Sequence, residues 1–369
     1  MGEVQGRGAK DKYLNRPNQI CRRIVLLGLL IAPLILQSSC GGGGGKDSNQ
    51  LVSSQEQVTP EAPEAPEITV SIAKWHGNQG SAMSFDWDDN NIDHCEKIAP
   101  LFNKYGFKAT FGIITDPVKR YIRDSNCYKS IAFDGHEIAS HSVNHQVRFN
   151  DLSASEESKL IQLRVSSEAI TEMFHAKPTL FIHPGNGLDE SNILYNRFYL
   201  FSRVHNPYDK DENFIANIVT VTNFDRMIYI LSLNQRDQNW VKMAGHGVDG
   251  YGYLPINSSD LNQFLSHLAG QSVWVDTHSK IGLYQMARTQ VSIQSSNGII
   301  DFNYGDLDLG LLSEFGVESL PLTIVIESGE AIKIDGYLDC EDFLPGGESL
   351  IFDYNILLQQ PLKYESCES

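Results

Sequence analysis

The chain has little positive charge for its length. Its 369 residues include 29 Lys and Arg against 46 Asp and Glu, which gives a formal net charge of −17. Beyond residue 39 the counts are 23 and 44, a net charge of −21. A surface of this sign repels polyanions, so the composition argues against nucleic acid as a partner and favours a neutral or cationic substrate.

Long apolar runs are also scarce. The run Ile24–Leu36 has 13 residues, whereas a membrane-spanning helix needs about 20. Six Lys and Arg precede this run, and the segment "QSSC" follows it, ending at Cys40. A basic start, a short apolar core and small residues before a cleavage site predict a secretory signal peptide over residues 1–39. An uncleaved N-terminal anchor is the alternative.

The residues after the predicted cleavage site suggest a lipid anchor. Cys40 and the glycines that follow it resemble a bacterial lipobox, although Gln37 stands where an apolar residue is usual. This resemblance predicts an exported bacterial lipoprotein, held to a membrane by lipid on Cys40, on the periplasmic side or at the cell surface. Residues 40–67 then form the lipidated cysteine and a disordered Gly-, Pro- and Glu-rich tether.

Cysteine is rare in the rest of the chain. Four remain beyond Cys40, and an even number in an exported protein permits two disulfides. We expect Cys95 to pair with Cys127 and Cys340 with Cys367, because each pair falls inside one predicted domain. Four free buried thiols are the alternative.

Residues 68–288 alternate short apolar runs with helical patterns. Runs at 82–85, 108–114, 178–184 and 240–246 predict strands, and a capping box from Ser153 to Glu156 predicts the start of a long helix. Alternating strands and helices favour an α/β fold with a parallel sheet. About seven such units predict a distorted (β/α) barrel.

The texture changes after Arg288. Residues 289–369 alternate apolar and polar side chains between turns rich in Gly, Asn and Ser. This pattern predicts a small antiparallel, sandwich-like β module.

Polar side chains collect where the predicted strands of the barrel end. Asp86 and Asp88 follow one strand, His141 and His145 lie near another, and His246 follows a later one. Two histidines and one carboxylate make an open three-ligand site of the kind a catalytic zinc uses. A solvated acidic turn, hydrogen-bonded loop histidines and a non-haem Fe(II) oxygenase site are the alternatives.

Four segments carry a specific resemblance. In chain order they are "SFDWDDN" at 84–90, "GHEIASHSVNH" at 135–145, "FIHPGNG" at 181–187 and "WVKMAGHGVD" at 240–249. They resemble the successive motifs of the polysaccharide deacetylase family, the NodB-homology carbohydrate esterases. The resemblance implies a metal-dependent hydrolase that removes acetyl groups from N-acetylated or O-acetylated polysaccharide. The implied metal is divalent, with zinc first and Co²⁺, Ni²⁺ or Fe²⁺ as alternatives.

The resemblance also implies roles for single residues. Asp86 would be the catalytic base, and Asp88 would bind the metal together with His141 and His145. Asp89 competes with Asp88 for the ligand role, because Trp87 separates the first two aspartates.

Three further roles follow from the later motifs. His246 would be the general acid that protonates the leaving amine, and the backbone N–H of Gly185 would help to stabilise the oxyanion. His183 is a candidate for substrate contact, with a supporting loop residue as the alternative. Three aromatic residues are candidates for sugar stacking or for ordinary packing: Trp75, Trp87 and Tyr251.

The first and third motifs depart from the family pattern. Trp87 interrupts the paired aspartates, and Ile182 stands where many members have an arginine that orients the base. These departures leave a second hypothesis, a catalytically degenerate carbohydrate-binding lipoprotein. The identity of the polysaccharide and the oligomeric state are open at this point.

Overall fold

The computed structural model of the protein describes residues 65–116, 125–147, 149, 151, 153–186, 190–204, 218–342 and 349–367. The predicted signal peptide, Cys40 and most of the tether lie outside these ranges. Within the ranges, none of the helices combines the length and the apolar character that a membrane crossing requires.

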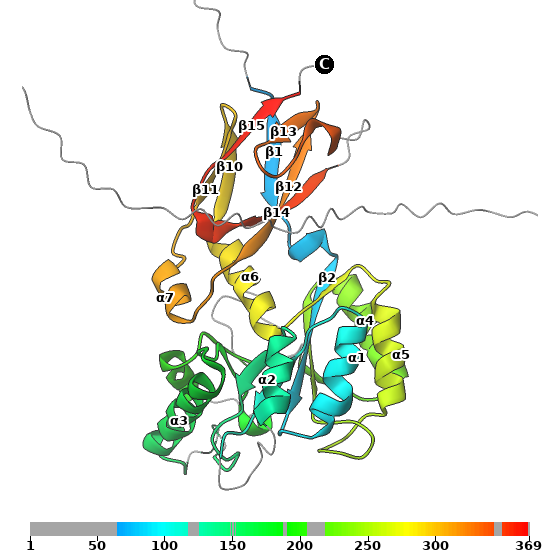
Figure 1. The fold of residues 1–369 in the computed structure, drawn as a ribbon, viewed down its shortest axis with the longest axis vertical. Coiled ribbons are helices and arrows are strands. Elements are labelled where there is room, and N and C mark those ends of the chain that lie inside the picture. Colours follow the sequence, from blue (N-terminus) through cyan, green and yellow to red (C-terminus); the bar gives the residue numbers. More distant parts are fainter. Residues whose placement is uncertain are drawn as a thin grey trace, which may run out of the picture. The chain divides into compact units, whose positions relative to one another are not determined.

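A curled parallel sheet forms the first part of the described chain (Figure 1). Its strands are β2 Ser81–Asp88, β3 Thr110–Ile113, β4 Glu137–Ser140, β5 Leu180–Phe181, β6 Phe201–Ser202, β7 Ile218–Thr220, β8 Trp240–Gly245 and β9 Val273–Val275. The order is β6-β5-β4-β3-β2-β8-β7, and β9 pairs with the start of β2. Every pairing in this sheet is parallel, so the predicted distorted (β/α) barrel of about seven strands is confirmed.

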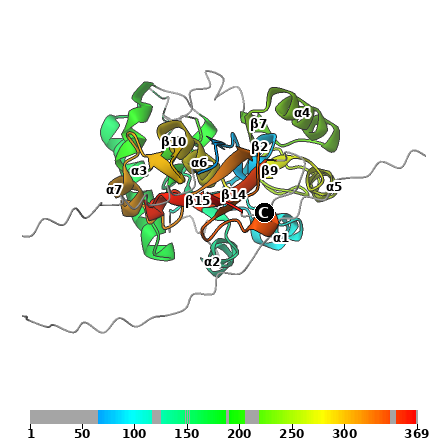
Figure 2. The ribbon, with the colours of Figure 1, turned by 90° about the horizontal axis from the view of Figure 1, so that it is seen from above.

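Helices surround this sheet, and α4 and α5 lie side by side in Figure 2. The helices are α1 Ala99–Lys104, α2 Ser125–Phe133, α3 Glu156–Phe174, α4 Phe224–Asp237, α5 Ser258–Leu268, α6 His278–Gln290 and α7 Leu309–Glu314. A π-helical segment, His94–Ile98, precedes α1, and short 3-10 turns occur at His76–Asn78, Pro184–Asn186, Glu190–Arg197, Cys340–Asp342 and Ile356–Leu358.

The long helix α3 starts with a different cap from the predicted capping box. Ser155 is the N-cap and accepts a hydrogen bond from the backbone N–H of Ser158. Ser153 donates both its backbone N–H and its hydroxyl to Asp151 instead. An Asx turn therefore occupies the predicted cap residue, and the helix begins with the next serine.

Strand β2 places its side chains on two faces of the sheet. All eight of its residues are buried, as expected for a parallel strand that is covered on both sides. Met83, Phe85 and Trp87 pack against the surrounding helices. The alternate residues, including Asp86 and Asp88, therefore face the interior of the barrel.

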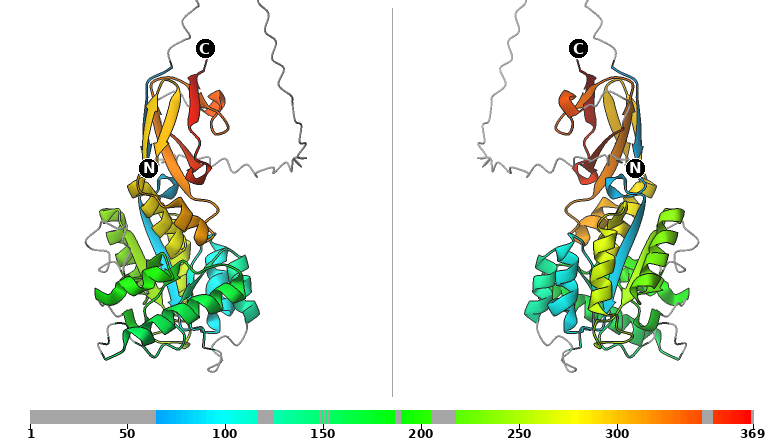
Figure 3. Two further views of the ribbon diagram at one scale, coloured as in Figure 1. Left: turned by 90° about the vertical axis from the view of Figure 1, so that its left-hand side faces the viewer. Right: turned by 90° about the vertical axis from the view of Figure 1, so that its right-hand side faces the viewer.

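The C-terminal part is an antiparallel module of two sheets (Figure 3). One has the order β1-β12-β14, with β1 Ile68–Ile72, β12 Pro321–Ser328 and β14 Leu350–Asn355. The other has the order β10-β11-β15-β13, with β10 Ser292–Ser296, β11 Ile299–Asn303, β15 Leu362–Ser366 and β13 Ile332–Ile334. Side chains of both sheets, such as Ile324 and Ile300, share one apolar core.

Strand β1 corrects the predicted domain limits. The prediction placed residue 68 at the start of the barrel, but Ile68–Ile72 pairs antiparallel with β12 of the module. The alternation of Ile68, Val70 and Ile72 with Thr69 and Ser71 suits a strand buried on one face. The module is therefore built from both ends of the described chain.

Both predicted disulfides are confirmed. Cys95 is bonded to Cys127, which ties the π-helical segment before α1 to α2. Cys340 is bonded to Cys367, which ties the end of the module to the turn after β13. Each bond lies within one part of the fold, as expected.

Candidate metal centre

The carboxyl end of β2 turns sharply at Asp89 and Asn90. Both residues have left-handed backbone angles, with φ of 77° and 52°. Asp and Asn tolerate this conformation better than most residues. The Asn90 side chain donates to the carbonyl of Ile114 and accepts from its N–H, at 2.8 and 2.7 Å. These bonds fix the turn against the end of β3.

This turn brings Asp89 to the two predicted histidines. The Oδ1 atom of Asp89 lies 3.4 Å from Nε2 of His141 and 3.6 Å from Nε2 of His145. The three ligand atoms all lie within 4.8 Å of one another. Asp89, the alternative ligand from the sequence, therefore joins His141 and His145, and Asp88 does not.

Residues 141–145 form a loop, here called the histidine loop, that orients the two imidazoles. The Nδ1–H of buried His141 donates to the carbonyl of Ile182 at 2.8 Å, which leaves Nε2 free to bind a metal in the neutral ring. The backbone N–H of His145 donates to the Ser142 hydroxyl at 3.0 Å. Ser142 and His145 both have left-handed φ, 70° and 58°, so the turn carries backbone strain.

The spacing of these atoms fits a divalent metal. Zinc–ligand bonds of about 2.0–2.2 Å at tetrahedral angles put neighbouring ligand atoms about 3.3–3.6 Å apart, which matches the two distances from Asp89. The Oδ1 atom of Asp89 is buried and makes no hydrogen bond among the described residues. Its environment is that of a ligand oxygen, and the remaining coordination positions are available to water and substrate.

The charges at this cluster affect the three candidate ligands differently. Burial raises the pKa of Asp89, but His141, His145 and His246 outweigh burial and hold it at about 2. Burial lowers the pKa of His145, and the neighbouring His141 lowers it further. Burial lowers the pKa of His141, but the charges of Asp88 and Asp89 outweigh burial and raise it. Asp89 is therefore ionised and His145 favours the neutral state, which are the states that bind metals, whereas a metal must compete with a proton at His141.

Asp88 has a different partner, Arg203. Two guanidinium nitrogens donate to the two carboxylate oxygens at 3.0 and 2.8 Å, and both side chains are almost fully buried. Burial raises the pKa of Asp88, but the charge of Arg203 outweighs it and leaves the pKa below its ordinary value. The prediction of Asp88 as a metal ligand is corrected by this geometry. Asp88 is a buried, oriented and ionised carboxylate beside the cluster.

A close packing contact keeps Asp88 beside the histidine loop. A Cβ atom on Gly112 of β3 would lie 3.1 Å from Oδ1 of Asp88 and 3.5 Å from Cβ of His141. It would also lie 2.9 Å from the side chain of Ile182. Only glycine leaves room for these three groups to approach one another.

Asp86 lies two residues before the end of β2 and has a different partner from Asp88. Its Oδ2 atom is 3.1 Å from Nδ1 of His278, and both side chains are fully buried. His278 packs against Trp240. Because β2 extends to Asp88, the adjacent pair at the strand end is Asp88 and Asp89, not Asp86 and Asp88.

His246 lies at the cluster, as predicted. Its Nε2 atom is 3.8 Å from Oδ2 of Asp89. Its carbonyl accepts from the side chains of Asn91 and His94, each at 2.7 Å. Burial lowers the pKa of His94 to about 4, so its ring stays neutral and donates from Nε2, while Nδ1 accepts from Tyr128. Sequence reasoning missed Asn91, His94 and Arg203.

The third motif is only partly at the site. His183 is fully buried and packs against the rings of Phe149, Phe181 and Tyr195, so a substrate contact is not supported. Gly185 is exposed, with φ of 68° in the turn after β5. Its role as an oxyanion donor stays a prediction.

The three aromatic candidates for sugar stacking differ in their exposure. Trp75 and Trp87 are buried in the core and cannot stack on a sugar. Tyr251 has half of its surface exposed and follows the His246 loop.

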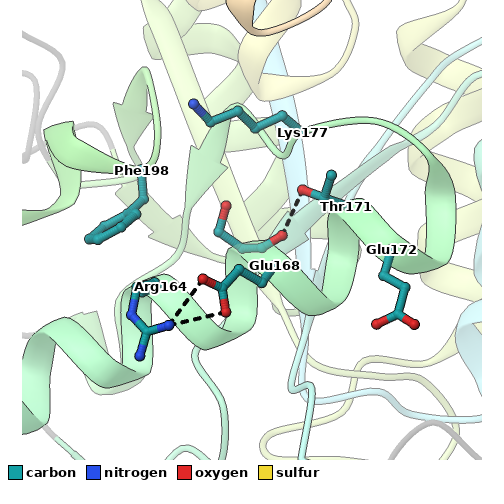
Figure 4. Close-up of a pocket in the computed structure, with 7 residues that line it drawn as sticks. Arg164, Glu168, Thr171, Glu172, Lys177 and Phe198 are labelled. Carbon is teal, nitrogen blue, oxygen red and sulfur yellow. Dashed lines mark hydrogen bonds and ion pairs between the residues drawn. The ribbon is translucent and has the colours of Figure 1, made fainter.

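A shallow depression on α3 contains none of the predicted site residues. It is lined by Arg164, Ser167, Glu168, Thr171, Glu172, Lys177 and Phe198. Figure 4 shows Arg164 paired with Glu168 and Thr171 donating to the carbonyl of Ser167. Lys177 pairs with Glu314 outside the depression. Its charges are largely balanced locally, which does not point to a charged ligand.

Comparison with known protein families agrees with the first three of the four motifs. Residues 77–197 match the family model described as polysaccharide deacetylase. The resemblance drawn from the sequence is thus confirmed over a segment that includes Asp86 to His145 and Gly185, whereas His246 lies beyond it.

Individual relatives are more distant. Over 320 residues the chain is 23% identical to a gellan lyase from Bacillus sp, covering 76% of this chain and 12% of that protein. Over 102 residues it is 31% identical to the uncharacterized protein YlxY from Bacillus subtilis (strain 168), covering 27% of this chain and 30% of that protein. The peptidoglycan deacetylase PdaC from Bacillus subtilis aligns with a TM-score of 0.39 at 19% identity, over 55% of this chain and 90% of that one. The chain spans less than a third of either curated relative.

Proposed function

We propose that the protein, whose residues 77–197 match the family model described as polysaccharide deacetylase, is a metal-dependent hydrolase that removes acetyl groups from polysaccharide. N-acetylated sugars are the first candidate and O-acetylated sugars the second. One observation carries the proposal: Asp89, His141 and His145 converge, with an ionised Asp88 and His246 beside them.

Three side chains would hold the metal: Asp89, His141 and His145. Zinc is the first choice, with Co²⁺, Ni²⁺ and Fe²⁺ as alternatives. A divalent ion bound there supplies Lewis-acid polarisation of the acetyl carbonyl and acidifies water. The backbone N–H of Gly185 would help to stabilise the oxygen of the tetrahedral intermediate.

Asp88 is the residue we assign as general base, in place of Asp86. It accepts the proton of the attacking water at a carboxylate oxygen, while the guanidinium of Arg203 keeps it ionised and oriented. An arginine has this orienting task in many members of the family, and here Arg203, after β6, takes the place of the residue missing at Ile182. Asp86 is assigned to the barrel interior through its bond to His278.

His246 is the residue we assign as general acid. Its Nε2 faces the cluster, and a proton there would pass to the leaving amine nitrogen when the tetrahedral intermediate collapses. Asn91 and His94 hold the His246 carbonyl and so fix where the ring lies.

Location is a separate proposal. The basic and apolar start of the chain and Cys40 support an exported lipoprotein anchored to a membrane, with an acetylated polysaccharide or oligosaccharide as its partner. Labelled palmitate should enter the protein and should be lost in Cys40→Ser. Labelling that persists in this variant would refute the assignment of the anchor.

The central test separates metal binding from proton transfer. Purified protein is assayed for bound metal and for acetate release from N-acetylglucosamine oligomers and acetylated xylan. We expect Asp89→Asn and His141→Ala to lose both metal and activity. Asp88→Asn should keep the metal and lose activity by about 10²–10⁴-fold.

The outcomes discriminate between the assignments. Metal loss in Asp88→Asn together with metal retention in Asp89→Asn would overturn the ligand assignment. Full activity in metal-stripped protein would end the proposal of a metal-dependent hydrolase. Asp86→Asn, which changes a buried residue outside the cluster, serves as the comparison for the base assignment.

A further inference from the structure

Exposed apolar side chains gather in one loop beside His246. Tyr251, Tyr253 and Leu254 are 51%, 66% and 59% exposed, and all three lie within four consecutive positions. We call residues 250–255 the tyrosine loop. Scattered exposed apolar residues are ordinary, but three within four residues at the edge of a candidate site indicate a binding surface.

The tyrosine loop is held rigidly at its base. The backbone N–H of Asp249 donates to the carbonyl of Ile256, and the N–H of Ile256 donates to that of Gly247, at 2.9 and 3.2 Å. The Asp249 side chain accepts from the N–H of Ser258 at 2.9 Å and pairs with Lys97 at 2.6 Å. The loop is therefore a preorganised structure whose apolar side chains stay in water in this conformation.

The backbone of the loop is strained at one non-glycine residue. Leu254 has φ of 47°, a conformation that costs a non-glycine residue about 1–2 kcal/mol. Gly250 and Gly252 have φ of 93° and 77°. Backbone strain at an exposed apolar residue is typical of functional loops.

Contacts tie the loop directly to His246. The Tyr253 ring lies edge-on to the His246 ring, with centroids 5.3 Å apart and an interplanar angle of 86°. A Cβ atom on Gly252 would lie 3.1 Å from Cβ of His246 and 2.8 Å from Nδ2 of Asn91. Ile92, 54% exposed, follows Asn91 on the adjacent turn. The apolar surface therefore continues from the proposed general acid outward.

We propose that the tyrosine loop is a sugar-binding subsite of the polysaccharide substrate, with Tyr253 stacking on the pyranose ring next to the one that is deacetylated. This inference rests on the proposed function. An aromatic ring offers an apolar face to the C–H groups of a sugar and a hydroxyl to its polar rim. The strongly negative chain favours a neutral glycan over a polyanion at this surface.

The subsite predicts a dependence on substrate length. Tyr253 touches the neighbouring sugar and not the acetyl group, so it contributes binding energy only when a second ring is present. A tetramer should be hydrolysed with a much lower KM than the monomer, and this advantage should depend on Tyr253. Binding that is equal in ground and transition states changes KM and leaves kcat unchanged.

The experiment compares substrates of two lengths. Acetate release is measured on N-acetylglucosamine tetramer and monomer and on acetylated xylotetraose and its monomer. Tyr253→Ala should raise KM for the tetramer by about tenfold and leave kcat within about twofold, with no change on the monomer. Tyr253→Phe should retain most of the tetramer affinity. Tyr229→Ala, which changes a 52% exposed tyrosine on α4, should alter neither KM nor kcat.

Each other outcome is decisive. An unchanged tetramer KM in Tyr253→Ala overturns the subsite, and so does an equal loss of kcat on monomer and tetramer, which would mean that Tyr253 only supports His246. If the wild type releases no acetate, the proposed function fails and the subsite is judged by calorimetric binding of the two tetramers. Binding lost in Tyr253→Ala then supports the subsite, and no binding by wild type refutes it.

Discussion

The barrel and the antiparallel module bury different kinds of side chain. Among the described residues, the buried polar and charged side chains lie between Ser81 and Ser279, and Thr323 is the single one in the module. The module core is built from aliphatic and aromatic side chains such as Leu322, Ile326 and Tyr354. Burying a charged side chain lowers the stability of a fold unless the charge is paired. The buried charges of the barrel therefore indicate that its interior serves chemistry as well as stability.

Backbone strain follows the same division. Left-handed non-glycine residues occur in and beside the candidate metal cluster, at Asp89, Asn90, Ser142 and His145. In the module, Asn297 and Gln359 adopt this conformation, one in a hairpin turn and the other at the end of a short helical turn. The barrel also has ordinary left-handed connections, at His175 and Gln238 after α3 and α4, so the left-handed residues around the candidate metal site are what distinguish it from the module.

The largest effect on stability is expected at the buried ion pair of Asp88 and Arg203 in the barrel. Arg203→Met leaves the Asp88 charge buried without its partner, which should lower the free energy of unfolding by about 3–5 kcal/mol. Burial should then raise the pKa of Asp88. Chemical denaturation of wild type and variant measures the change.

Two further variants test whether the loss of stability comes from the unpaired buried charge. Asp88→Leu combined with Arg203→Met should recover most of the stability and none of the activity, because no charge is left unpaired. Arg236→Met removes a surface arginine from a bond to Asp237 of similar geometry and should have no measurable effect. Equal losses at the buried and exposed pairs would show that burial is not the cause.

Sequence patterns predicted the barrel correctly, but they did not show at which residue strand β2 ends. The motif "SFDWDDN" offered three aspartates, and sequence alone did not say where the strand stops. Alternation along β2 puts Asp86 and Asp88 on one face, and the turn after Asp88 sends Asp89 to the histidines. The partner of Asp86, His278, lies 192 residues further along the chain, and no local pattern indicates such a pair.

Strand β1 of the module also shows that sequence patterns do not reveal distant partners. The alternation in Ile68–Ile72 is visible in the sequence, but its partner β12 lies more than 250 residues away, so the strand was assigned to the nearer domain. The disulfides were predictable because each pair lies within one part of the fold. Local periodicity determines the type of an element, and long-range packing determines its neighbour.

The two disulfides should separate stability from activity. They close loops of similar length, with sequence separations of 32 and 27, so removing either should cost about 3–4 kcal/mol. The double variant Cys95→Ser, Cys127→Ser should also lower kcat, because Cys95 follows His94, which holds the His246 carbonyl. Cys340→Ser with Cys367→Ser should leave kcat unchanged at a temperature where both variants are folded. An equal effect on kcat would contradict the division of roles.

The smallest expected effect is a dependence of stability on pH that comes from a buried histidine of the barrel. This residue is His136, whereas His76 lies beside the module, with Nδ1 3.4 Å from Oδ1 of Asp353. Burial, helped by Lys108, lowers the pKa of His136 from 6.5 to about 4, and its Nδ1 accepts from the Ala109 N–H. Between these values the unfolded chain binds a proton that the folded chain does not, so stability falls as pH falls from 6.5 to 4 and levels off below.

The full shift corresponds to about 3 kcal/mol, and solvent screening reduces the expected loss to about 2 kcal/mol. His136→Asn keeps an acceptor for the Ala109 N–H and cannot titrate, so its unfolding free energy should be flatter than that of wild type across this range. His175→Asn is the matched control, because His175 is exposed and its left-handed φ of 56° suits asparagine. Denaturant titrations at pH 4, 5, 6 and 7 measure the difference. If the His136→Asn and wild-type curves run parallel, the buried ring is not the source of the acid sensitivity, and the charges at the metal cluster become the next place to look.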